Sequence, residues 1–147
     1  MNRSLLDGML ARVPQIDLIE ETYLAVTPAR VAAAIREPAF TGALWPDIRL
    51  AVFMDRGDAG MRWTATGALV GSCEIWLEPY GDGVIAHTYL RTDATAPGST
   101  TEPAVLAPRV ALRELRRRAT HAKQVWWRLK DTLEAGRGPG QPAAGAR

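Results

Sequence analysis

GSCEIWLEPYGDGVIAHTYLR, residues 71–91, contains two runs of alternating side chains on either side of a Tyr-Gly-Asp-Gly turn. Both runs are rich in β-branched and aromatic residues, and Gly-Asp-Gly between such runs is typical of a β-hairpin. With the turn centred between Gly81 and Asp82, Trp76 lies opposite His87 and Glu74 lies opposite Tyr89. The stretch therefore predicts an antiparallel hairpin with its polar and aromatic groups on one face.

Strand patterns continue upstream of this hairpin. IRLAVFM (48–54) and GMRWTAT (60–66) are separated by turn residues, so residues 48–91 are predicted to form a four-strand antiparallel meander. DLIEETYLAV (17–26) has the composition of another strand, and Thr27-Pro28 then favours the start of a helix that ends near Arg36. AFTGALWPD (39–47) is expected to form a short turn of helix and a loop.

Residues 109–134 form the one long helical pattern. Its apolar positions step by threes and fours along one face, and they are Ala111, Leu115, Ala119, Ala122, Trp126, Leu129 and Leu133. An antiparallel sheet with one apolar face and a helix of matching length predicts an α+β helix-grip fold, with the helix covering the sheet.

The composition indicates one globular domain. The chain has 147 residues, of which 47% are hydrophobic and 23% charged. We expect a lead-in segment with a short amphipathic helix at 1–15, the domain at 16–135 and a disordered tail at 136–147. The single cysteine, Cys73, excludes an internal disulfide and fits a reducing, cytoplasmic location, and we find neither a signal peptide nor a membrane anchor.

Several stretches together resemble a known superfamily. EETYLAVTPARVAAAI (20–35), the Trp45-Pro46 dipeptide, LEPYGDGV (77–84) and RLKDTLEAG (128–136) are similar to the SRPBCC or START-like superfamily, and more narrowly to bacterial proteins of the polyketide cyclase/dehydrase and lipid-transport family. The resemblance covers nearly the whole domain. The superfamily normally has six strands between the short helices and the last helix, whereas this chain has four clear ones, so a shortened sheet is expected.

This resemblance implies a cavity between the sheet and the long helix that accepts an apolar or aromatic ligand. Candidate ligand-binding residues are Trp45, Met54, Met61, Trp63, Trp76, Arg118, Ala122 and Trp126. Trp45 is either a plug at the cavity mouth or a loop anchor. Arg118, close to the buried seam of the helix, would reach an acidic group of the ligand or pair with Glu114 one turn earlier.

The hairpin offers a catalytic alternative. If its polar face lines the cavity, His87 could transfer protons with Glu74 as its charge partner, and Tyr89 and Arg91 could donate to a substrate oxygen, as in a cyclase or dehydrase. We expect the opposite facing, because polar alternation on an antiparallel sheet normally faces solvent.

The remaining candidates are weaker. Cys73 is expected to be an inert buried thiol, and the two histidines lack metal-ligand spacing, so no metal or cofactor is predicted. The arginines of the last helix fit a solvated face better than a nucleic-acid site, although an interaction module remains an alternative. Trp127 lies far from the buried seam and suggests contact with the N-terminal segment or a second subunit. The preferred function is binding or transport of a hydrophobic small molecule.

Overall fold

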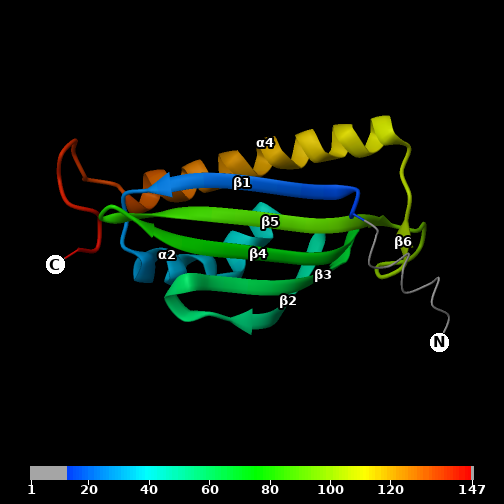
Figure 1. Ribbon diagram of the computed structural model, residues 1–147, viewed down its shortest axis with the longest axis horizontal. Helices are drawn as coiled ribbons and strands as arrows, with labels where there is room; N and C mark the ends of the chain where they lie inside the picture. The colour runs from blue at the N-terminus through cyan, green and yellow to red at the C-terminus, as the bar shows by residue number, and fades with distance from the viewer. Residues whose placement is uncertain (1–12, 147) are drawn as a thin grey trace.

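One antiparallel sheet with its α-helices on one face makes up residues 13–146, the part of the chain that this computed structural model describes (Figure 1). The elements are, in chain order, β1 (Ile16–Leu24), α2 (Pro28–Ile35), α3 (Pro38–Leu44), β2 (Ile48–Asp55), the 3₁₀ turn η1 (Gly57–Ala59), β3 (Gly60–Gly67), β4 (Leu69–Tyr80), β5 (Gly83–Thr95), β6 (Pro103–Ala104) and α4 (Pro108–Leu133). The predicted helix at residues 4–12 lies outside the described residues. The helix-grip arrangement is confirmed.

The sheet has the strand order β1-β5-β4-β3-β2, and β6 pairs with β5 beyond the start of β1. The meander is confirmed, with Trp76 opposite His87 and Glu74 opposite Tyr89. β4 begins at Leu69 and β5 ends at Thr95, so both strands extend beyond the hairpin of residues 71–91, and Gly71 lies inside β4. A Cβ at Gly71, whose φ is 151°, would lie 2.1 Å from the Arg91 carbonyl oxygen, so glycine is needed for this close approach.

Two prolines start the short helices. Pro28 and Pro38 occupy the first turns of α2 and α3, where the missing N–H costs nothing. α3 is a complete short helix and not the single turn that we predicted. The connection from α3 to β2 is only Trp45, Pro46 and Asp47, so this segment is held close to the sheet.

The core lies between the sheet and the helices. We call the sheet face under α2, α3 and α4 the inner face, and the other the outer face. Buried inner-face side chains alternate along the strands and include Ile16, Leu18, Leu24, Met61, Trp63, Cys73, Ile75, Leu77, Val84, Ala86 and Leu90. The predicted seam of α4 is confirmed, since its residues are buried or packed against this core.

The two edges of the sheet differ. On β1, the carbonyl oxygens of Glu21 and Tyr23 accept hydrogen bonds from Lys123 and Lys130 of α4, at 2.6 and 2.8 Å. On β2, three consecutive apolar residues, 52–54, are exposed. One edge is therefore capped by charged side chains, and the other presents apolar ones.

Residues 136–146 differ from the expected disordered tail. The Ala144 N–H donates to the Ala25 carbonyl at 2.8 Å, and the Thr27 N–H donates to the Ala144 carbonyl at 2.9 Å. The Ala143 N–H donates to Asp82 at 3.0 Å, and the Ala143 side chain is buried. Backbone hydrogen bonds, which composition does not reveal, hold this segment against the turn after β1.

Candidate functional site

The four residues predicted for catalysis lie on the outer face. His87, Glu74, Tyr89 and Arg91 alternate with residues that are buried under the helices, so their side chains point away from α4. Catalysis in the cavity requires them on the inner face, and this requirement is not met.

His87 is held by the protein's own groups. It is only 8% exposed, its ring stacks on Trp76 at 4.6 Å between centroids, and the Tyr89 ring lies nearly parallel at 6.4 Å. Its Nε2 lies 2.7 Å from Glu78 Oε2, and its Nδ1 lies 3.4 Å from Glu21 Oε1. The imidazole is therefore a packed and paired group of the outer face.

The other charged groups of the hairpin are also paired. Glu74 bonds to Arg56 at 2.9 Å and lies 3.5 Å from Arg62, and Arg91 lies 3.6 Å from Asp17. A hollow of about 330 Å³ lies over these groups. The pairs are of the cross-strand kind expected on a solvated face.

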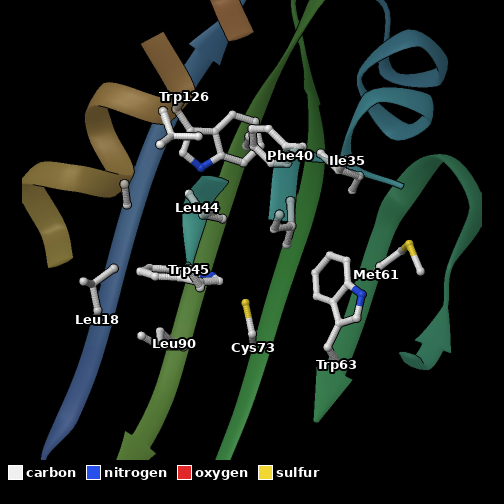
Figure 2. Packing of buried hydrophobic residues seen from close by; sticks show 14 of the residues in the cluster. Leu18, Ile35, Phe40, Leu44, Trp45, Met61, Trp63, Cys73, Leu90 and Trp126 are labelled. Atoms are coloured by element: carbon white, nitrogen blue, oxygen red, sulfur yellow. The ribbon is translucent and has the colours of Figure 1, made fainter. Parts of the chain in front are cut away.

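The inner side presents a different candidate, centred on Trp45. This side chain is 1% exposed and lies among Leu18, Leu44, Cys73 and Leu90, between the sheet and the helices (Figure 2). Its indole Nε1 has no hydrogen-bond partner within the described residues. Most of the interior is built by strands and helices, but this large ring comes from the connection between α3 and β2.

A cleft of about 240 Å³ opens to solvent beside Trp45. It is lined by Leu44, Trp45, Pro46 and Asp47 on one side and by Arg117, Arg118 and His121 of α4 on the other. A second hollow, of about 530 Å³, is also lined by Pro46 and Asp47. Asp47 therefore lines two open spaces.

Arg118 is the buried charge of this cleft, at 4% exposure. Asp47 receives two hydrogen bonds from its guanidinium, at 2.9 and 2.6 Å, and Glu114 receives a third at 2.6 Å. The predicted pairing with Glu114 is present, and Asp47 is a partner that sequence reasoning missed. The sequence indicated this pairing only through the acidic residue that directly follows Trp45-Pro46.

The ion pairs shift the pKa values of the two acids. The hydrogen bonds from Arg118 lower the pKa of Asp47, and partial burial opposes this effect. The pKa of Glu114 is lowered first by Arg117 and then by Arg118, again against burial. Both carboxylates are therefore ionised at neutral pH. Burial raises the pKa of the Cys73 thiol to about 12, although the Trp45 indole acts to lower it. The thiol is therefore protonated at neutral pH and unreactive.

A polar cluster on the inner face was also missed. Thr22 donates to Glu20 Oε1 at 2.8 Å, and Lys123 forms an ion pair with the same carboxylate. The Trp126 indole N–H donates to Thr88 Oγ1 on the neighbouring strand at 2.8 Å. Strict alternation along β1 predicts that Glu20 points inward, because it lies two residues after the buried Leu18 and shares its face.

An apolar groove of about 350 Å³ lies between α3 and α4, and Phe40, Val125 and Leu129 contribute to it. The Phe40 ring packs edge to face on Trp126 at 4.9 Å between centroids (Figure 2). Phe40 therefore lines the groove and also contacts the buried ring of Trp126.

The other predicted ligand-binding residues divide between the faces. Met61, Trp63, Ala122 and Trp126 are buried on the inner side, with Trp45. Two residues lie apart from them. Trp76 is on the outer face at 38% exposure, and Met54 is exposed on β2 opposite Arg62, because a register shift near Val52 changes the facing there.

Residues 13–146 show neither a metal-binding cluster nor a membrane-spanning helix. Within that range, no group of three or more His, Cys, Asp or Glu side chains is placed to hold a metal ion. The same residues contain no helix with the length and hydropathy needed to cross a bilayer.

Two solved structures share this architecture. The Aha1 dimer from Colwellia psychrerythraea is 13% identical, with a TM-score of 0.54, over 84% of this chain and 99% of that one. DR_A0006 from Deinococcus radiodurans is 11% identical, with a TM-score of 0.57, over 82% of this chain and 98% of that one. The chain has the helix-grip fold. No protein-family model matches it, and no curated protein matches it in sequence. At these identities the likeness concerns the fold alone.

Proposed function

We propose that this protein binds a hydrophobic small molecule, such as a lipid, a polyketide or an aromatic metabolite, between the inner face of its sheet and α4. The proposal gives it the role of a carrier or sensor. The observation that carries the proposal is the position of Trp45, a fully buried ring that comes from a three-residue connection beside an open cleft.

Movement of this connection would make room without unfolding the sheet or α4. Trp45 is held by packing, because its indole N–H has no hydrogen-bond partner in the described part of the chain. The rings of Trp126 and Phe40 would form part of the wall that the ligand meets. An apolar space with a few polar groups is the usual form of a small-molecule site.

We also propose that the chain belongs to the SRPBCC or START-like superfamily and works in the cytoplasm. The helix-grip fold supports the first proposal, and the single buried cysteine supports the second.

The test of binding is a titration with N-phenyl-1-naphthylamine, a neutral dye whose emission rises in apolar surroundings. We expect saturable binding by the wild-type protein and several-fold tighter binding by Trp45→Leu, whose smaller side chain fills less of the site. Trp127→Leu, which changes an exposed tryptophan, is the matched control and should bind like wild type.

Native mass spectrometry of gently purified protein would then identify a co-purified ligand. The proposal fails if neither the wild-type protein nor Trp45→Leu binds the dye up to its solubility limit while both remain folded.

We further infer that the Trp127 face is a contact between two copies of the chain. Trp127 is 55% exposed on α4, and the Lys123 ammonium lies 6.0 Å from its ring centre. The Aha1 structure from Colwellia psychrerythraea is a dimer, which supports the proposal of self-association.

A further inference from the structure

The connection Trp45-Pro46-Asp47 combines two chemical groups within three residues. The ring of Trp45 occupies the apolar interior, and the carboxylate of Asp47 binds the buried guanidinium of Arg118. A small molecule with an aromatic or apolar body and one carboxylate carries the same two groups.

The two members of the ion pair are exposed to different degrees. The Arg118 side chain is 4% exposed, whereas the Asp47 side chain is 45% exposed. When Asp47 leaves, Glu114 still accepts from Arg118 Nε, but both terminal nitrogens of the guanidinium lose their acceptor. Unpaired N–H groups on a buried guanidinium cost far more than an exposed acid left unpaired. Asp47 can therefore move into water if another carboxylate takes its place on Arg118.

The charges around Arg118 favour an anion as that replacement. Arg117 and Arg118 bond to Glu114 and Asp47, so two guanidinium groups meet two carboxylates. When Asp47 leaves, the remaining three groups carry one net positive charge. An incoming carboxylate restores neutrality and can form the same paired hydrogen bonds.

The surroundings provide room for the exchange. Asp47 lines two open spaces, of about 240 and 530 Å³. No hydrogen bond holds the Trp45 indole N–H within the described residues, so none would be broken when the ring leaves the interior.

We propose that the segment 45–47 is an internal substitute for the ligand, and that the ligand is an apolar, ring-containing carboxylic acid that displaces it. This inference rests on the proposed function and adds the chemical class of the ligand. The carboxylate of the ligand binds Arg118 in place of Asp47, and its apolar body takes the position of Trp45. The free protein is autoinhibited by its own segment.

The experiment compares naphthalene-2-acetate with naphthalene-2-acetamide, its neutral amide, by isothermal titration calorimetry. Wild-type protein should bind the carboxylate several-fold more tightly than the amide. In Asp47→Ala the competing carboxylate is gone, so a larger fraction of the protein is ready to bind, and affinity for naphthalene-2-acetate should rise about tenfold. Affinity for the amide should change much less.

Asp55→Ala is the matched control, because Asp55 is an exposed acid that pairs with Arg36 away from the cleft. It should bind both compounds like wild type. Thermal unfolding shows whether each variant is folded. The comparison of acid with amide in the wild-type protein tests the inference even if a variant does not fold.

Three results would overturn the inference: equal affinity of the wild-type protein for acid and amide, weaker binding of the acid by Asp47→Ala, or a similar gain in Asp55→Ala. The proposed function would survive the first result, because a neutral ligand would still bind. It would fail on the separate result given above, in which neither the wild-type protein nor Trp45→Leu binds the neutral dye.

Discussion

Trp45 and Trp127 are the same residue type in opposite surroundings. Trp45 is enclosed between the sheet and the helices, whereas more than half of the Trp127 side chain is open to solvent. Replacing each of them in turn shows how much a buried indole ring adds to the free energy of unfolding compared with an exposed one.

We expect Trp45→Ala to lower the free energy of unfolding by about 3–5 kcal/mol, because it removes buried apolar surface and leaves a cavity. Trp127→Ala should change it by no more than about 0.5 kcal/mol. Urea denaturation of the two variants and of the wild-type protein measures both values. Equal losses would mean that the interior around residue 45 collapses and keeps no space for a ligand.

The backbone at Gly71 is the critical point of the β4–β5 pairing. We expect Gly71→Ala to destabilise the protein by about 1–3 kcal/mol, because the new Cβ would collide with the Arg91 carbonyl and the φ angle is unfavourable for alanine. Gly42→Ala in α3, where a Cβ meets nothing within 4 Å, should instead be neutral or stabilise by up to about 1 kcal/mol.

The midpoints of thermal unfolding of both glycine variants provide the comparison. A Gly71→Ala protein as stable as wild type would show that β4 shifts easily relative to β5 at this point.

The link between α4 and the segment before β2 depends on pH. Asp47 and Glu114 have lowered pKa values in the folded protein, so each binds a proton less readily there than in the unfolded chain. Their stabilising effect is complete above the ordinary values of 3.8 and 4.5, and it is lost as the pH falls through the lowered ones.

We therefore expect the midpoint of thermal unfolding to fall as the pH is lowered from 5 toward 3, and to fall less steeply in Asp47→Asn. Circular dichroism at a series of pH values measures this slope. Identical slopes in both proteins would mean that the Asp47–Arg118 pair contributes little to stability.

The elements were easier to predict from the sequence than the site. Alternation and turn residues placed the four strands of the meander, and apolar spacing placed α4, because both depend on local patterns. The facing of His87 also followed from alternation. Asp47 could not be paired with Arg118, because the two are far apart in the sequence and meet only through the tertiary fold. Met54 was misplaced because a register shift near Val52 leaves no reliable pattern in the sequence.

In residues 13–146 a single layer of helices covers one face of the sheet, and none of these residues forms a second layer over the outer face (Figure 1). If Trp127 marks a contact between copies, the wild-type protein should sediment as a dimer at high concentration. Trp127→Ala should shift it toward the monomer, and Tyr80→Ala, which removes an exposed ring elsewhere, should not. Analytical ultracentrifugation distinguishes the species, and a dimer that persists in Trp127→Ala would place the contact elsewhere.

The unequal edges of the sheet limit how far strands of different molecules can add to one another. Lys123 and Lys130 bond to the Glu21 and Tyr23 carbonyl oxygens of β1, so an approaching strand finds these two acceptors already used. Two molecules that joined through β2 would each present to a third the β1 edge, where the lysines already occupy two carbonyl oxygens. Sheet growth would then stop at a pair, and the lysines of α4 would act as terminators that keep an apolar edge strand from seeding fibrils.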